Sequence, residues 1–411
     1  NQPGGFGGHA VGGIYNSGAL TITASTLANN YGGGGGAGSG SVSAGDGGDG
    51  VGAIQNGMGG VLSIDQDTID SFTNNIGGGG SGGGGLNGDN GASVNGIDGV
   101  YTLLGSEQTF TVNTLTDEMD GSVIDGDISL RDAIAAANPG DTIEFDAGLS
   151  GGVIRLSNAL GSLVIANGAN LIIDGDINDD NAPDITIDGD TNDNGADAMD
   201  VTVFQIDAGA TAEIVGLTIM GGYAVGGMGS NGTNGANQGV GDASEGGNGT
   251  DGTDGGDAAG GIYNAGSLTL TDSVLSGNMA IGGQGGSGGN GGTGGVTLSG
   301  GTGYSGGNGG YAGRGGHAAA GLLNAGAATL TNVTLTGNAA TGGLGGIGGD
   351  GGTGGPSSGG PSGGRGGFGR PGGDGGYAAP VLNLGTLVVD TIAQSTNTQT
   401  AGSGGAGGDG G

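Results

Sequence analysis

Two acidic segments near the middle of the chain carry the residues best suited to hold a metal ion. They read Asp-Gly-Asp-Ile-Asn-Asp-Asp over 174–180 and Asp-Gly-Asp-Thr-Asn-Asp-Asn over 188–194. Side-chain oxygens that alternate within a turn suit Ca²⁺, which takes about six to eight hard oxygen ligands. The predicted calcium ligands belong to these two segments, with one further acid between them: Asp174, Asp176, Asn178, Asp180, Asp184, Asp188, Asp190, Asn192 and Asn194.

These segments are not EF-hand loops, because neither has glycine at the sixth loop position or glutamate at the twelfth. The alternative to a calcium site is a pair of acidic, solvated turns that join short strands at 171–173, 185–187 and 201–203. A second acidic group is a further calcium candidate: Asp117, Asp120, Asp125 and Asp127.

The basic residues argue against catalysis. Enzymes that cleave polysaccharides on a β-helix need clustered carboxylates and a basic partner that stabilises developing charge. This chain has no lysine, and three of its five arginines lie in glycine-rich segments. Arg131 is predicted to pair with an acid on its own helix. His9 and His317 each stand seven residues before a repeated asparagine, which indicates equivalent structural positions. The chain is therefore predicted not to be an enzyme.

Short repeats built on an Asn-x-Gly turn must position these residues. In each copy a second asparagine follows 14 residues after the first. The pairs are Asn16 and Asn30, Asn264 and Asn278, Asn324 and Asn338, and Asn383 and Asn397, and a looser copy begins at Asn56. After each turn, apolar residues alternate with Thr or Ser, as in a strand with one buried face.

A unit of about 20 residues cannot bury its own apolar face, so the copies must stack on one another. The sequence predicts a parallel β-helix in which like residues lie above like. Leu268 and Leu270 should then align with Ala328 and Leu330 in a common core. The repeated asparagines are expected to form structural ladders.

Glycine-rich insertions between the repeats have a strict period of three. After Ile281, pairs of glycines precede Gln284, Ser287, Asn290 and Thr293; the next segment has Asn308, Tyr311, Arg314 and His317 in the same phase. A period of three fits an extended left-handed helix whose other two edges are bare glycine backbone. Each insertion, or lobe, is predicted to be an outgoing and a returning leg of polyglycine II-like helix. The alternative is a flexible linker.

The two ends of the sequence show the same phasing. Residues 1–11 match a returning leg without its outgoing partner, and 402–411 match an outgoing leg without its return. Because each end supplies what the other lacks, we expect copies of the chain to join head to tail. The rival explanation is that the chain is cut from a longer one in which these legs are joined covalently.

The middle of the chain differs from the repeats and resembles a known family. Ser129 and Asp132 form a helix N-cap signal, and Pro139-Gly140 ends that helix. The stretch from Phe110 to Phe145, which contains Ile-Ser-Leu-Arg-Asp-Ala-Ile-Ala-Ala-Ala-Asn-Pro-Gly, resembles the CSLREA domain of bacterial surface proteins. In this chain isoleucine replaces the name-giving cysteine and aspartate replaces the glutamate.

The repeats resemble those that follow CSLREA domains and those of polymorphic outer-membrane adhesins. The matching motifs include Gly52-Ala-Ile54 and Phe72-Thr-Asn74-Asn75. This resemblance implies a right-handed parallel β-helix, export and attachment to, or adhesion at, a bacterial surface.

Composition limits the possible partners. The net charge of −34 at pH 7 argues against nucleic acid and anionic membranes, because few side chains could neutralise phosphates. The absence of cysteine excludes disulfides and thiolate metal sites. Aromatic residues make up only 3% of the chain, so a stacked architecture fits better than an ordinary globular core.

The sequence therefore predicts an all-β chain with one short α-helix and projecting glycine lobes, in three regions. These are coils with lobes over 1–105, a CSLREA-like module leading into acidic turns over 106–220, and coils with long lobes over 221–411. The expected function is extracellular and structural, with the chain itself as partner in a filament or matrix. The main alternative is a monomeric adhesin that binds a host surface or polysaccharide. Ice binding and polysaccharide cleavage are further alternatives.

Overall fold

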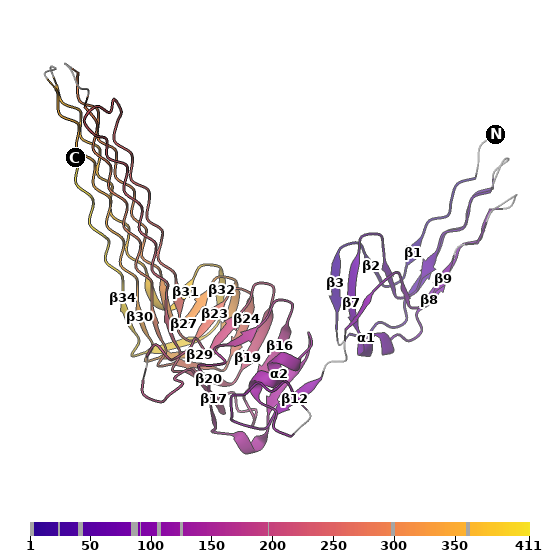
Figure 1. Cartoon of the computed structure of the whole chain (residues 1–411). Helices are drawn as coiled ribbons and strands as arrows, with labels where there is room; N and C mark the ends of the chain where they lie inside the picture. Colours follow the sequence, from indigo (N-terminus) through magenta and orange to yellow (C-terminus); the bar gives the residue numbers. More distant parts are fainter. Residues whose placement is uncertain are drawn as a thin grey trace. The chain divides into compact units, whose positions relative to one another are not determined.

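The computed structural model describes residues 4–23, 25–39, 44–83, 89–90, 92–104, 108–123, 126–195, 197–296, 301–358 and 362–411 (Figure 1). The chain divides into two compact units. The smaller comprises Asn1–Gln108 with Asn138–Gly140, and the larger comprises Thr109–Ala137 with Asp141–Gly411. Both consist mainly of short strands in parallel sheets, which confirms the prediction of a parallel, all-β chain. None of the described helices is long and apolar enough to cross a membrane.

In the larger unit, successive repeats contribute successive strands to the same sheets, here called the strand stack. One sheet has the order β12 (Thr109–Val112), β13 (Thr142–Phe145), β16 (Asn170–Asp174), β19 (Thr211–Val215), β24 (Ser267–Thr271), β28 (Ala327–Thr331), β32 (Thr386–Val389). A second has the order β14 (Val153–Arg155), β17 (Ile185–Asp188), β20 (Leu217–Met220), β25 (Val274–Ser276), β29 (Val333–Thr336), β33 (Ile392–Ser395).

Two further sheets complete the strand stack. One contains β15 (Leu163–Ile165), β18 (Phe204–Ile206), β23 (Ile262–Asn264) and β27 (Ala318–Asn324), and β27 also pairs with β22 (Ala258–Ala259) and β31 (Ala378–Asn383). The other has the order β21 (Tyr223–Val225), β26 (Met279–Ile281), β30 (Ala339–Thr341), β34 (Thr398–Thr400).

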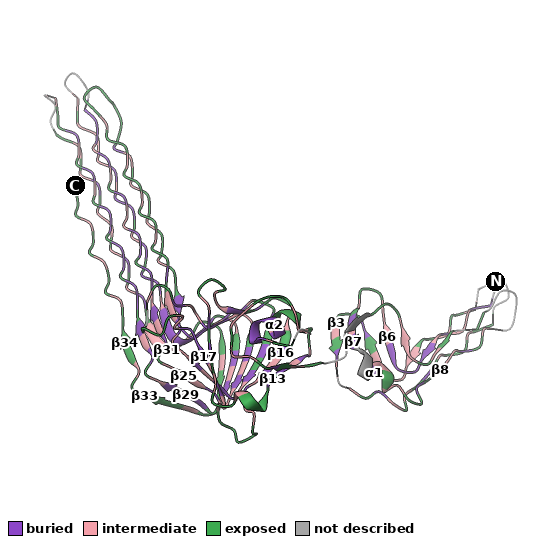
Figure 2. Ribbon diagram, turned by 60° about the horizontal axis from the view of Figure 1, so that its bottom comes forward, coloured by how far each residue is buried: buried purple, intermediate pink, exposed green. Residues whose placement is uncertain are grey.

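Like residues lie above like in this stack, as the repeat alignment predicted. Leu268 pairs with Ala328, and Leu270 pairs with Leu330, which pairs in turn with Val389. Leu270 and Leu330 are fully buried in one continuous, mostly aliphatic core. Buried residues lie along the strands of the larger unit (Figure 2). Burying a side chain of this size stabilises the fold by about 1.5–3 kcal/mol.

The repeated asparagines form two ladders beside the core, and four of them are buried: Asn264, Asn278, Asn324 and Asn338. Asn264 donates from Nδ2 to Oδ1 of Asn324 at 2.7 Å, and Asn324 donates in the same way to Asn383 at 2.7 Å. In the second ladder, the Nδ2 of Asn278 lies 3.0 Å from the Oδ1 of Asn338. Each amide satisfies the next, so these polar groups can be buried without an unpaired donor.

A helix closes one end of the core. Helix α2 (Leu130–Ala136) begins at the N-cap Ser129, whose side chain accepts a hydrogen bond from the N–H of Asp132. Its Leu130 and Ala133 are buried in the aliphatic core. A 3₁₀ turn, η1 (Ala147–Leu149), follows β13.

The smaller unit repeats the plan on a shorter scale. Its sheets have the orders β1 (Ala10–Val11), β5 (Gly50–Val51), β9 (Ser93–Val94); β2 (Ile14–Asn16), β6 (Ile54–Asn56), β10 (Ile97–Asp98); β3 (Ala19–Ile22), β7 (Val61–Asp65), β11 (Thr102–Leu104); and β4 (Tyr31–Gly33), β8 (Ile76–Gly78). Helix α1 spans Gln66–Asp70. Asn16 pairs with Asn56 in register, so the looser repeat copy is confirmed.

The glycine lobes of the larger unit run side by side as extended legs (Figure 1). Outgoing legs occupy 226–238, 282–295, 342–355 and 402–411, and returning legs occupy 246–257, 303–317 and 363–377. We call these legs together the sheaf. Backbone hydrogen bonds join them throughout, for example from Gly283 N to Gly256 O at 2.9 Å and from Gly316 N to Gly283 O at 2.8 Å.

Candidate functional site

Triplets inside the sheaf have three positions with different hydrogen-bonding partners. The first glycine donates its N–H to the next lobe, as Gly285 does to Leu344 O at 2.8 Å. The second glycine donates to a neighbouring leg of opposite direction, as Gly286 does to Thr253 O at 2.8 Å. Where the preceding lobe has Asn, Asp, Ser or His at the matching position, the third, outward residue donates its N–H to that side chain. The N–H groups of such a triplet therefore pair with three different neighbours.

The outward residues form a ladder of side chain to backbone bonds. Oδ1 of Asn231 accepts the N–H of Ser287 at 2.8 Å, and Oδ1 of Asp254 accepts the N–H of Arg314 at 2.6 Å. The partners are separated by 56 or 60 residues, which is one lobe to the next. The sequence did not predict these bonds, although the Asn and Asp residues one lobe before each N–H were a visible signal.

Bare glycine is a steric requirement inside the sheaf. A β-carbon on Gly286 would overlap the carbonyl oxygen of Ser230 in the preceding lobe. None of the described legs lies on that side of the first outgoing leg, and a β-carbon on Gly227 meets nothing within 4 Å. Serine and threonine accordingly occupy the second position in this leg, at Ser230 and Thr233.

The last outgoing leg keeps glycine where the described chain does not require it. A β-carbon on Gly404, Gly407 or Gly410 would come no closer than 3.5 Å, 3.7 Å or 3.9 Å to another atom. The N–H groups of these three glycines make no hydrogen bond to any described residue. The same holds for the first-position glycines of the neighbouring returning leg: Gly366, Gly369, Gly372 and Gly375. Among the described residues, this side of the sheaf, here called the open face, is a row of backbone donors without a partner.

A complementary bare edge lies in the smaller unit. Its first returning leg packs Gly4 and Gly7 against a neighbouring leg, where a β-carbon would overlap carbonyl oxygens of Gly38 and Gly35. On its other edge, Gly5 and Gly8 have nothing within 4 Å of a β-carbon. The leg thus presents the glycine edge that the open face lacks.

The first acidic turn uses its carboxylates to hold its own backbone. Oδ1 and Oδ2 of Asp176 accept the N–H groups of Asp180 and Asn181 at 3.0 and 2.8 Å. The Nδ2 of Asn178 lies 3.5 Å from Oδ1 of Asp184. Oδ2 of Asp184 is buried and makes no hydrogen bond to the described residues.

The second acidic turn is built in the same way. Asp190 accepts N–H groups from Asn194 at 3.3 Å and Gly195 at 2.8 Å. Desolvation opposes ionisation of Asp190, but these backbone bonds outweigh it and lower its pKa. The backbone N–H of Met199 donates to Asp197 and lowers its pKa, and the side-chain amides of Asn194 and Asn192 add to this effect.

The acids at the strand ends behave differently. Burial raises the pKa of Asp174, and the nearby carboxylates of Asp176 and Asp179 add to this effect. With Glu144 these three acids line a cavity of about 180 Å³. Burial also raises the pKa of Asp188, against the N–H of Asp190 and the guanidinium of Arg155 at 3.4 Å.

The calcium site therefore stays a prediction. Among the described residues, no three His, Asp or Glu side chains converge as metal ligands. The observed bonds within each turn agree with the alternative of acidic, solvated turns. Asp125, from the second acidic group, lies outside the described residues.

The prediction for Arg131 is wrong. Its guanidinium makes a two-pronged ion pair with Asp117 at 2.8 and 3.0 Å, not with an acid of its own helix. Both side chains are buried, and Arg131 also donates to the carbonyls of Gly161 and Ser162. A buried guanidinium needs all its donors satisfied, and these partners lie on other segments. Arg131 holds the helix to the strand stack.

The two histidines occupy equivalent positions, as predicted. Nδ1 of His317 accepts the N–H of Tyr377 at 3.0 Å, and Nδ1 of His9 accepts the N–H of Asp49 at 3.0 Å. Both are members of outward-residue ladders at the base of a returning leg.

Comparisons with known protein families, curated proteins and solved structures found no match to this chain. The likeness of Phe110–Phe145 to the CSLREA domain thus rests on its motif alone.

Proposed function

We propose that this chain is a structural protein of a bacterial surface that assembles head to tail outside the cell. In this proposal the parallel sheets are the faces of a right-handed β-helix, and the sheaf is a bundle of polyglycine II-like helices. The open face of one copy receives the returning leg of the smaller unit of another. Residues 4–9 of one subunit would then lie beside residues 402–411 of the next.

The complementarity of the two bare edges supports this contact. Inside the sheaf, the first-position edge of each outgoing leg faces a returning leg: a β-carbon on Gly285 would overlap Gly313 O, and one on Gly345 would overlap Gly373 O. Gly404, Gly407 and Gly410 have this edge uncovered among the described residues. A second-position glycine edge is what fits there, and Gly5 and Gly8 provide one.

The free energy gained from hydrogen bonds at the contact is opposed by the cost of association and by charge repulsion. Each backbone hydrogen bond formed at the open face would contribute about 0.5–1.5 kcal/mol after the loss of water. Joining two molecules costs about 4–15 kcal/mol, so several bonds and the packing of strand ends must act together. Repulsion between subunits of charge −34 opposes the contact and must be screened by salt. A head-to-tail contact of this kind propagates as a fibre unless its rotation closes a ring.

The test is a substitution that blocks the open face without disturbing the fold. In G404V/G407V the new side chains point into open space, so the melting temperature should not change. Wild-type protein should form fibres in salt and calcium, seen by electron microscopy and light scattering, and the variant should stay monomeric. Gly227→Val, on the opposite outer side of the sheaf, is the control and should still form fibres. Wild-type protein that stays monodisperse at high concentration contradicts the proposal.

A monomeric adhesin is the second candidate, and one observation favours it. Large aromatic side chains stand exposed along the returning legs: Tyr311 is 47% exposed, Phe368 74% and Tyr377 69%. Exposed aromatic rows on a rigid support are typical of binding surfaces.

A further inference from the structure

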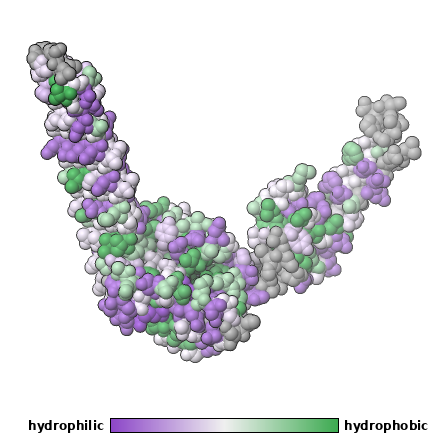
Figure 3. Space-filling model, viewed as in Figure 1, coloured by the Kyte–Doolittle hydropathy of each residue, from purple (hydrophilic) through white to green (hydrophobic). Residues whose placement is uncertain are grey.

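The two edges of the sheaf differ in chemistry. Outward residues of the outgoing legs are mostly small polar or aliphatic groups, such as Ser287, Asn290 and Ile347, with two acids at Asp350 and Asp409. Outward residues of the returning legs include the aromatic and basic side chains of the sheaf. In Figure 3 the visible face of the sheaf mixes hydrophilic and hydrophobic side chains along its length. The returning edge therefore combines charges and rings, whereas the outgoing edge does not.

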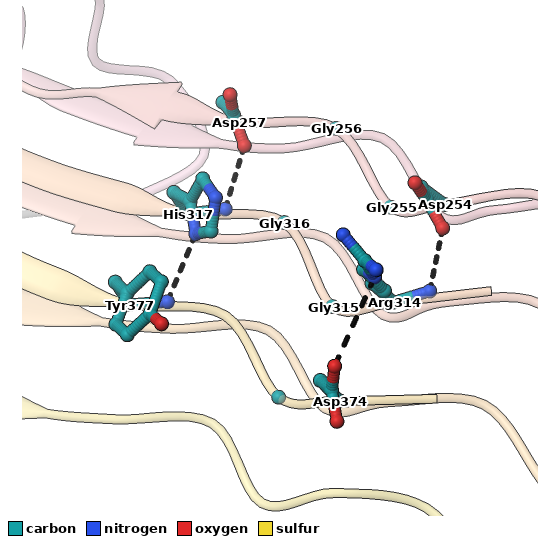
Figure 4. Close-up of a pocket in the computed structure, with 11 residues that line it drawn as sticks. Asp254, Gly255, Gly256, Asp257, Arg314, Gly315, Gly316, His317, Asp374 and Tyr377 are labelled. Atoms are coloured by element: carbon teal, nitrogen blue, oxygen red, sulfur yellow. Dashed lines mark hydrogen bonds and ion pairs between the residues drawn. The ribbon is translucent and has the colours of Figure 1, made fainter. Parts of the chain in front are cut away.

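A groove lies on this edge near the base of the sheaf. It has a volume of about 810 Å³ and takes its side chains from three successive returning legs: Asp254, Asp257, Arg314, His317, Asp374 and Tyr377 (Figure 4). Glycines between these residues also line the groove, and they do not fill it because they have no side chain. A groove of this size is within the range of ligand sites.

In three side chains of the groove, one polar atom is bound by backbone N–H groups of the sheaf and the other is available to a ligand. Oδ1 of Asp254 and of Asp257 accepts the N–H of Arg314 and of His317, each at 2.6 Å. Nδ1 of His317 accepts the N–H of Tyr377, so its proton is on Nε2. The second carboxylate oxygens and this N–H are the groups left to face a ligand. Such anchoring removes the entropy cost of ordering the side chains on binding.

The groove also has an aromatic platform and a donor. The rings of His317 and Tyr377 are stacked with their centres 5.1 Å apart. Arg314 lies 3.9 Å from Asp374, an exposed pair that leaves guanidinium donors available. Carboxylate acceptors, N–H donors and a flat ring together match a ring-shaped ligand that carries many hydroxyl groups and has an apolar face.

The charged residues of the groove further restrict which ligands can bind. Three aspartates face one arginine in the groove, so an anionic ligand would be repelled. The bound Oδ1 atoms and the adjacent guanidinium make the groove a poor cage for a cation. An uncharged polysaccharide remains as the fitting ligand.

A similar set of acids and aromatic rings, without an arginine, occurs in the smaller unit. Phe6, His9, Asp46, Asp49 and Asp89 line a cavity of about 330 Å³ on its returning legs. His9 lies 3.2 Å from the carboxylate of Asp49, so an aromatic ring again lies beside acids one leg away. Along a leg the outward residues recur about every 9 Å, which is three residues of about 3.1 Å each. A repeating ligand can therefore engage successive rows.

We propose that the returning-leg groove binds an uncharged polysaccharide chain, with His317 and Tyr377 stacking on sugar rings and Asp254 and Asp257 accepting hydroxyl protons. The site deepens the adhesin candidate and does not depend on head-to-tail assembly.

The test is affinity electrophoresis of the full chain through gels that contain galactomannan, hydroxyethyl cellulose or dextran. We expect retardation in at least one neutral gel, and none in gels with polygalacturonate. Tyr377→Ala removes one ring of the aromatic platform and should weaken the retardation at least tenfold. Because this side chain is exposed and does not pack in the core, the fold should be unchanged. Ile347→Ala, on the outgoing edge where Ile347 is 54% exposed, is the control and should bind as wild type does.

Three outcomes overturn the proposal. They are no retardation in any neutral gel, retardation only by a charged polymer, and equal binding by the Tyr377→Ala and Ile347→Ala variants. Melting curves of both variants check that the fold is intact. Because G404V/G407V leaves this groove untouched, its binding to the neutral gel separates failure of the groove from failure of assembly.

Discussion

The strand stack and the sheaf are built from the same repeats but are held together in opposite ways. In the strand stack, aliphatic side chains such as Leu270 and Leu330 fill a buried core. In the sheaf, inner legs carry glycine on the edges that meet, and backbone bonds such as Gly316 N to Gly283 O replace the core. One region depends on side-chain volume and the other on its absence. Glycine-rich sequence is therefore compatible with order when every N–H has a partner.

The largest expected effect breaks the strand stack. Leu330→Asp places an unpaired charge in the core and should cost more than about 4 kcal/mol, so the protein should fail to fold cooperatively. Thr329→Asp, its outward neighbour in β28, is the control and should cost less than about 1 kcal/mol. Urea unfolding followed by circular dichroism measures both. Similar losses for the two variants would mean that the strand faces are assigned wrongly.

Removal of calcium should act on the strand stack alone. If the acidic turns bind the ion, saturation at about 100 times the dissociation constant contributes about 2.7 kcal/mol. A chelator should then lower the melting temperature, and D176N/D190N should abolish that difference. An identical melting curve with and without chelator rejects the calcium prediction for 174–194.

The matching change in the sheaf is the addition of one methyl group. Gly283→Ala forces a β-carbon onto Gly227 O and should cost about 1–3 kcal/mol, as overpacking does. Gly227→Ala occupies the same triplet position in the first leg, has open space, and should be neutral. Hydrogen exchange of neighbouring amides, measured by mass spectrometry, reports the loss locally. Equal protection in both variants would show that the legs do not need bare glycine.

A smaller effect is expected from the asparagine ladder. Asn324→Ala leaves the Nδ2 of Asn264 without its ladder partner in a buried position, which should cost about 1–3 kcal/mol. Asn383→Ala, at the exposed end of the same ladder, should cost less because water replaces the amide. Thermal unfolding of the two variants shows whether burial determines how much each asparagine of the ladder contributes to stability.

The smallest effect is expected from a change in pH. The pKa of Asp190 is lowered in the folded chain, so its ionised form stabilises the fold above about pH 4, the ordinary value, and that stability is lost as the pH falls. Asp190→Asn should therefore be less stable than wild type at pH 7, with the difference shrinking in acid. The pKa of Asp174 is raised, so its ionisation weakens the fold, and Asp174→Asn should gain stability at pH 7. Melting curves in chelator from pH 3 to 7 would contradict this assignment if both variants changed in the same direction.

Much of the fold was predictable because residues of the same type recur at fixed spacing along the sequence. The alternation through Leu268 and Leu270, the asparagine pairs and the triplet phase each indicated which residues lie above one another. The partners of Arg131 were not predictable, since Asp117 is brought near only by the fold. The bond from Asp254 to the N–H of Arg314 depends on the register between legs 60 residues apart. Local spacing could not distinguish a calcium cage from a turn whose carboxylates bind their own backbone.

The triplet ladder also restricts how a lobe can change its length during evolution. An insertion of one or two residues in an inner leg would move later outward residues onto positions such as Gly286, where a β-carbon would overlap a neighbouring carbonyl oxygen. Whole triplets, added to an outgoing leg and to its returning leg together, keep all partners in place. Insertions and deletions should therefore come in sixes, shared by adjacent lobes. Each such step would move the lobe tip about 9 Å farther from the strands, without altering a single residue of the aliphatic core.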